Sequence, residues 1–197
     1  MGPELLPMVF TSGWASGVNA YAVVLILGLF GRFGGVDAVP SPLERTDVLV
    51  AAAVLFAIEM VADKIPYLDS AWDAVHTVVR PAIGAALGAL LAGDASTLEQ
   101  AVLATTGGAT ALASHAVKAG LRAAVNTSPE PASNIVVSTA EDLTVAGVIS
   151  LSVVQPWIAA TLAACLLVIG AVLVLVALSR IRAVRARRRD RRLRAPT

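Results

Sequence analysis

Long apolar runs separated by short polar segments dominate this chain of 197 residues. A bilayer core is about 30 Å thick, so a helix that rises about 1.5 Å per residue crosses it in about 20 residues. Six runs of that order occur, and several are rich in glycine and alanine, which let helices pack closely. They predict six transmembrane helices, at about 14–30, 41–63, 72–93, 98–117, 135–154 and 157–178.

Polar residues mark the ends of several of these helices. Helix starts are predicted where side chains can accept hydrogen bonds from free backbone N–H groups: the capping box Ser41-Pro42-Leu43-Glu44, Asp69 or Ser70, and the capping box of Ser96 and Glu99. Lys64-Ile65-Pro66 predicts a stop after the second helix. The polar segment 127–134, with two prolines, predicts a stiff turn before the fifth helix.

The two halves of the chain resemble each other. Three matches occur in the same order: residues 11–16 with 105–110, Glu59 with Glu141, and 81–91 with 156–166. Three helices per half is an odd number, so the halves are expected to be inverted repeats, at residues 1–93 and 94–179. The alternative is six alanine-rich helices that are similar only in composition.

The distribution of basic residues predicts an orientation. Nine of the fifteen basic residues are arginines between Arg180 and Arg194, whereas the rest of the chain holds six basic and thirteen acidic residues. Basic segments stay cytoplasmic, which places the arginine tail, 180–197, inside the cell; this tail is expected to be disordered. With six crossings both termini are cytoplasmic, and the protein is a multi-pass protein of the cell membrane (inner or plasma membrane).

The composition agrees with a membrane protein. Hydrophobic residues make up 57% of the chain and charged residues 15%, against roughly 25% charged residues in a soluble domain. The expected partners are the lipid bilayer and, at the arginine tail, anionic lipids. A homodimer is left open. Nucleic acid is not expected, because an arginine run beside a membrane span usually fixes topology.

Carboxylates inside apolar runs are the main functional candidates. Glu59 and Asp63 lie four residues apart and share a helix face, and Glu141 and Asp142 interrupt the fifth apolar run. Ionisable groups within spans usually face a bundle interior or a wet cavity. We expect Glu59 and Glu141 to meet and to bind a cation or exchange a proton. The alternative is that each acid pairs with a neighbouring base as a structural contact.

Basic residues form a second candidate site near the cytoplasmic face. The candidates for balancing charge or binding an anion are Lys64, Arg80, His115, Lys118 and Arg122. Together they would form a pocket for a phosphate head group. The alternative is that they are positive residues flanking the spans. The supporting polar residues are expected to be Asp69, Asp73, Asn126 and Asn134.

No catalytic motif is visible in the chain. It has no phosphate loop, no nucleophile elbow, no Cys/His spacing for zinc, and one cysteine, Cys165. We therefore expect no enzyme activity and no cofactor, and whether a metal ion binds is left unknown.

Four motifs carry a family resemblance: 59–69 (EMVADKIPYLD), 79–81 (VRP), 115–122 (HAVKAGLR), and 126–134 (NTSPEPASN) followed by Glu141-Asp142. Through them the chain resembles the domain-of-unknown-function 4126 membrane proteins over nearly its whole length before the tail. The resemblance implies a polytopic architecture and marks these residues without assigning an activity. The segment 59–64 is also similar to the Glu-x-Gly-Asp-Lys-Thr motif of cation/proton exchangers, but it has one more residue between the acids and no glycine.

The sequence thus predicts an all-α integral membrane protein with six transmembrane helices in two inverted three-helix repeats. The expected function is that of a small secondary transporter, which moves an ion or small solute through paired intramembrane carboxylates. Two alternatives are a protein that binds or translocates an anionic phospholipid or polyprenyl phosphate, and a membrane scaffold that does not transport.

Overall fold

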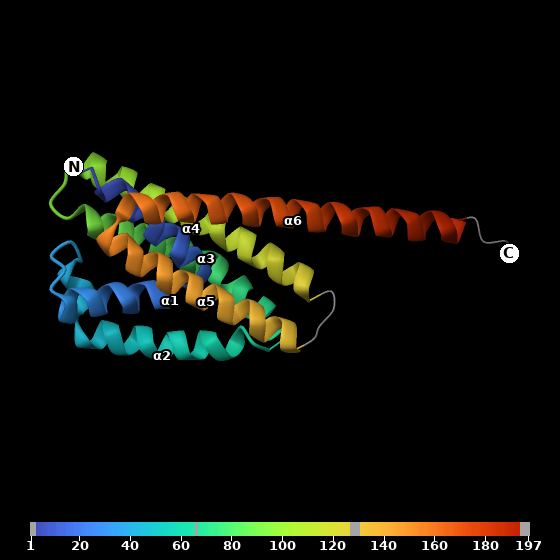
Figure 1. Ribbon diagram of the computed structural model, residues 1–197, viewed down its shortest axis with the longest axis horizontal. Coiled ribbons are helices and arrows are strands. Elements are labelled where there is room, and N and C mark those ends of the chain that lie inside the picture. Colours follow the sequence, from blue (N-terminus) through green and yellow to red (C-terminus); the bar gives the residue numbers. More distant parts are fainter. Residues whose placement is uncertain (1–2, 66, 127–130, 194–197) are drawn as a thin grey trace.

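The computed structural model describes residues 3–65, 67–126 and 131–193, and every regular element within these ranges is a helix. The all-α prediction is confirmed for this part of the chain. The elements are α1 (Leu5–Gly34), the 3₁₀ helix η1 (Ser41–Glu44), α2 (Thr46–Ala62), α3 (Leu68–Ala92), α4 (Thr97–Val125), α5 (Pro131–Val154) and α6 (Pro156–Leu193). Figure 1 shows a bundle of helices along which α6 runs and beyond which it projects.

Four of the described helices, α1, α3, α5 and α6, are long and apolar enough to cross a membrane. Helix α2 has 17 residues, which at 1.5 Å each is about 25 Å. Helix α4 has 29 residues but carries a stripe of buried polar and charged side chains. Of the six predicted transmembrane helices, four in the described chain are therefore supported by length and composition.

Helix α1 is not a single rod, because it breaks at Asn19, where the backbone is extended (φ −149°, ψ 94°). Gly13, before the break, lies against Gly107 of α4, and Gly28, after it, lies against Leu49 of α2. Gly107 precedes Lys118 by eleven residues, and Leu49 precedes Glu59 by ten. Because Lys118 and Glu59 form an ion pair, Gly107 and Leu49 lie at the same level of the bundle. The two halves of α1 therefore form a hairpin whose tip is Asn19.

This hairpin changes the expected topology. In Figure 1 the start of α1 and the connection from α1 to α2 lie at one end of the bundle, and the end of α6 lies at the other. Helices α2 to α6 each run from one end of the bundle to the other. In an arrangement of six crossings the first apolar run would reach the other end of the bundle, whereas here it turns back at Asn19 to the end from which it started.

The predicted inverted repeat does not fit the first pair of matched segments. An inverted repeat requires residues 11–16 and 105–110 to run in opposite directions. Gly13 contacts Gly107 and Gly17 contacts Ser114, so the first half of α1 and α4 run in the same direction.

Two of the predicted helix starts are wrong and one is confirmed. Residues 41–44 form η1, which no side chain in the described part of the chain caps, and α2 begins only at Thr46. Helix α3 begins at Leu68 after Tyr67, whose φ of 69° ends the connection from α2. The capping box of Ser96 and Glu99 is present in full.

The other boundary predictions are met in part. Helix α2 ends at Ala62, just before the predicted stop, although Pro66 itself lies outside the described residues. Of the predicted turn at 127–134, residues 127–130 lie outside them too, and the remainder begins α5. Helix α6 continues through Leu193, whereas the tail was expected to be disordered from residue 180. The helix can continue because arginine favours helices and because no glycine or proline interrupts residues 171–193.

Small residues determine how closely the helices approach one another. A side chain on Gly107 of α4 would overlap the backbone of Gly84 on α3, and one on Gly88 would overlap the backbone of Leu103. A side chain on Gly13 would overlap Gly107 in the same way. Because backbones meet without intervening side chains, α1, α3 and α4 bring their polar stripes into direct contact.

Candidate functional site

A buried set of alternating acids and bases, which we call the charge network, connects α2, α3, α4 and α5. Lys118 of α4 is its centre. The Lys118 Nζ atom lies 2.6 Å from Asp63 Oδ2, 3.6 Å from Glu59 Oε1 and 3.7 Å from Glu141 Oε2. The two glutamates from the two halves of the chain therefore lie against the same ammonium group.

Arg80 of α3 extends the charge network in one direction. Its guanidinium lies 2.7 Å from Glu59 Oε1 and 2.9 Å from Asp73 Oδ1, and these side chains are buried. Arg80 and Asp73 are seven residues apart, two helical turns, and so share the face of α3 that the sequence pattern indicated.

Arg122 of α4 extends the network in the other direction. It lies 2.6 Å from Glu141 Oε2, 3.4 Å from Asp63 Oδ2 and 3.9 Å from Asp69 Oδ2. It also donates a hydrogen bond to the backbone carbonyl of Asp63 at 2.7 Å. Since Asp63 is the C-cap of α2, this carbonyl belongs to the negative end of that helix, where a cation is stabilised.

The tip of the α1 hairpin contacts two bases of the charge network through backbone carbonyl groups. The break at Asn19 leaves the last carbonyl groups of the first half of α1 free to accept other hydrogen bonds. Val18 O accepts one from Lys118 at 2.9 Å, and Gly17 O accepts one from Arg80 at 3.4 Å. The negative end of a half-helix thus faces two cations.

Asn19 itself holds the second half of α1. Its Oδ1 accepts a hydrogen bond from the N–H of Ala22 at 3.0 Å, the geometry of an N-cap. Its Nδ2 donates to Asp142 Oδ1 at 3.0 Å. Asp142, predicted to share the carboxylate site, instead supports the hairpin tip, beside the network rather than within its ion pairs.

Two histidines, His115 and His76, make different contacts: His115 bonds to Arg80 of the network, and His76 lies among aromatic side chains. His115 Nδ1 accepts a hydrogen bond from Arg80 at 2.8 Å, so its other nitrogen carries the proton and lies 3.1 Å from the Thr77 hydroxyl. His76 stacks on Trp72 and lies 2.9 Å from the Tyr21 hydroxyl. His115 was predicted as part of a basic site, but here it is a neutral acceptor for Arg80.

The remaining predicted residues lie at the edge of the network. Asn126 donates to both carboxylate oxygens of Asp69, at 3.0 and 2.9 Å, and accepts a hydrogen bond from Asn134 at 3.2 Å. These contacts tie the ends of α3, α4 and α5 together. Lys64 donates to Met60 O and to the Ser138 hydroxyl, and makes no ion pair with the network in the described part of the chain.

The charge network holds more acids than bases. Ion pairs link three basic side chains to five carboxylates: Arg80, Lys118 and Arg122 to Glu59, Asp63, Asp69, Asp73 and Glu141. If all are ionised, the formal charge is −2. One oxygen of each of three carboxylates, Glu59 Oε2, Asp63 Oδ1 and Asp73 Oδ2, accepts no hydrogen bond from the described residues.

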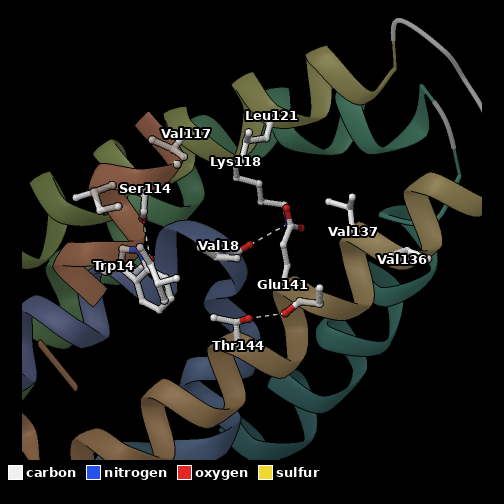
Figure 2. A pocket seen from close by; sticks show the side chains of 14 residues that line it. Trp14, Val18, Ser114, Val117, Lys118, Leu121, Val136, Val137, Glu141 and Thr144 are labelled. Carbon is white, nitrogen blue, oxygen red and sulfur yellow. Dashed lines mark hydrogen bonds and ion pairs between the residues drawn. The ribbon is translucent and has the colours of Figure 1, made fainter. Parts of the chain in front are cut away.

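A cavity of about 330 Å³ reaches the network between α1, α4, α5 and α6. Its walls are mostly apolar, and Lys118 and Glu141 are the charged residues that line it. Figure 2 shows Lys118 extending towards Glu141, with Trp14 and Ser114 on one side and Val136 and Val137 on the other. Among the described residues, no group of three or more His, Cys, Asp or Glu side chains is arranged to hold a metal ion.

The comparison with protein families gave one decisive result. The family model described as "Domain of unknown function (DUF4126)" matches residues 6–176. The chain belongs to this family. The comparison with curated proteins gave no match, and neither did the comparison with solved structures. Membership of DUF4126 confirms the resemblance seen in the sequence motifs.

The motifs of this DUF4126 protein supply most of the charge network. The segment 59–69 provides Glu59, Asp63 and Asp69, and the segment 115–122 provides His115, Lys118 and Arg122. Sequence reasoning missed Asn19, Tyr21 and Trp72. A signal for Asn19 was present, since a polar amide after Gly17 interrupts an apolar run at the point where the helix breaks.

Proposed function

We propose that this DUF4126 protein is a secondary transporter that couples movement of a charged solute to protonation of the charge network. The observation that carries the proposal is the broken helix α1, whose tip faces the buried ion pairs. Transporters commonly build their sites from interrupted helices at membrane depth, where half-helix ends and freed carbonyls bind charged groups.

The balance of charges supports proton coupling. Each carboxylate of the network already faces a guanidinium or ammonium group, so a proton fits such a site better than a metal ion that needs several free oxygens. Protonation of one of the carboxylates that face Lys118 would weaken its contact with that ammonium group and shift Lys118 towards the remaining carboxylates. A single proton would then bias two arrangements of α4 and α5, which is the basis of alternating access.

The topology proposed for the protein follows from the hairpin. We place α2 to α6 across the cell membrane, with the basic end of α6 in the cytoplasm according to the positive-inside rule and the start of α1 on the outer side. An inverted repeat is retained only for α2–α3 and α5–α6, whose directions are opposite. Anionic lipid is proposed to bind the arginine segment, and a homodimer stays open.

The two other functions from the sequence receive less support. A phosphate-bearing lipid at a basic pocket requires accessible bases, but Lys118 and Arg122 have side chains only 2% and 1% exposed and are paired with carboxylates. A scaffold without transport gives no reason for a buried network with excess acid, because buried ion pairs contribute little net stability.

The proposal is tested by flux measurements in proteoliposomes loaded with a pH-sensitive dye. We expect a pH gradient or membrane potential to drive a signal in the wild type that is lost in the double variant Glu59→Gln, Glu141→Gln. The matched control is Asp47→Asn, an exposed carboxylate of α2 far from the network, which should leave the signal unchanged. Equal signals from wild type and a folded double variant would contradict proton coupling through these residues.

A further inference from the structure

The cavity between α1, α4, α5 and α6 combines an apolar interior with one accessible charge. Besides Lys118 and Glu141, its lining is formed mainly by valine, leucine and alanine side chains and by Trp14. A volume of about 330 Å³ is within the range of small-molecule sites. The cavity therefore suits a compact apolar body that carries a single charge.

The sign of that charge follows from which group the cavity exposes. The Glu141 side chain is 16% exposed, whereas the Lys118 side chain is 2% exposed. Within the described parts of the chain, both ion pairs of Glu141 use its Oε2 atom, which leaves Oε1 to face a ligand. The ammonium of Lys118 is already surrounded by Asp63, Glu59, Glu141 and the carbonyl of Val18.

The charge network beside the cavity also favours a cation over an anion. Its five carboxylates and three bases leave an excess of negative charge, which an entering cation reduces and an entering anion increases. In a site shielded from water such differences are much larger than at the surface. An anion would also have to displace a carboxylate from Lys118.

We propose that this cavity binds a lipophilic organic cation, with Glu141 as its counter-ion. This proposal rests on the proposed transport function, because it names the substrate class of the transporter. Binding of the cation is measured independently of flux. The ligand class is a monovalent cation with an apolar body, such as a hydrophobic amine or quaternary ammonium or phosphonium compound. A cation bound at Glu141 would compete with Arg122 and Lys118 for the charge of that carboxylate.

The test compares two ions of nearly the same shape and opposite charge. We would measure equilibrium binding of radiolabelled tetraphenylphosphonium, and separately of tetraphenylborate, to the protein in nanodiscs, and subtract binding to empty nanodiscs. Saturable binding of the phosphonium and not of the borate is expected. Glu141→Gln should weaken phosphonium binding by about tenfold or more, because a counter-ion in a shielded site is lost, and Asp47→Asn should not.

A second variant tests the cavity without changing charge. Val137→Phe adds bulk to the lining and should also weaken phosphonium binding, while a thermal unfolding curve shows that each variant remains folded. Saturable binding of the borate instead, or unchanged phosphonium affinity in both folded variants, would overturn the proposal. Phosphonium binding through Glu141 without proton flux would support this inference and count against transport. Proton flux without phosphonium binding would support transport and count against this inference.

Discussion

Arg80 is a fully buried guanidinium held between the carboxylates of Glu59 and Asp73. A guanidinium stays protonated in proteins, so these two acids keep their partner over the whole physiological range. Each acid also has one oxygen without a hydrogen bond in the described structure. The pairings of this residue are therefore expected to matter more for stability than those of any surface ion pair.

Arg80→Ala is expected to destabilise the protein by about 3–5 kcal/mol, because it leaves the buried carboxylate of Asp73 without its ion-pair partner and that of Glu59 with Lys118 alone. The matched control is Arg45→Ala, which removes an ion pair with Asp47 whose side chains are 66% and 65% exposed. That change should cost less than about 1 kcal/mol. Unfolding of both variants in detergent, followed by circular dichroism, measures the difference, and equal losses would contradict the assigned role of Arg80.

Single residues were partly predictable from the sequence. Glu59, Asp63, Lys118 and Arg122 stood out because charge is rare in apolar runs and is costly there unless it is paired. Their partners were not predictable, because helix periodicity specifies a face but not the neighbour that the face meets.

At the scale of helices, contact between backbones sets the geometry of the site. Helices α3 and α4 meet at Gly84 and Gly107, and the first half of α1 meets α4 at Gly13. These contacts bring the stripe with Arg80 beside the stripe with Lys118. The glycines therefore position charges that lie about one turn away in α3, from Gly84 to Arg80, and about three turns away in α4, from Gly107 to Lys118.

Gly107→Ala should destabilise the bundle by about 1–3 kcal/mol, because its new methyl group would overlap the backbone of α3. Gly147→Ala in α5 is the control, since a Cβ at that position meets no described atom within 4 Å. This control should be neutral or stabilising by up to about 1 kcal/mol, as alanine favours helix over glycine. Thermal unfolding of the two variants measures the difference in stability. A Gly107→Ala protein as stable as Gly147→Ala would show that α3 and α4 do not meet at Gly107.

At the scale of the whole molecule, the hairpin of α1 predicts that the start of α1 lies on the opposite side of the membrane from the side expected for six crossings. Six crossings place residues 4 and 70 on one side and residue 94 on the other. With the hairpin, residues 4 and 94 share a side, because α1 returns to the end from which it started (Figure 1).

Cysteine labelling in intact cells distinguishes the two topologies. In a Cys165→Ala background we expect a membrane-impermeant thiol reagent to label Glu4→Cys and Asp94→Cys, but to label Ser70→Cys only after the membrane is opened. Labelling of Glu4→Cys only after opening, together with Ser70→Cys, would restore six crossings and contradict the hairpin in the membrane.

The sequence by itself determined the helical class, the membrane-like composition, the residues of the charge network and the capping of α4. These properties depend on local chemistry: apolar length, the cost of burying charge, and side chains that satisfy free N–H groups. The tertiary structure alone decided that α1 turns back at Asn19 and that Glu59 and Glu141 share one ammonium group. It also decided that Asp142 supports the tip and that the cavity exposes Glu141. These features depend on which helix faces meet, and that is set by packing between segments far apart in the chain.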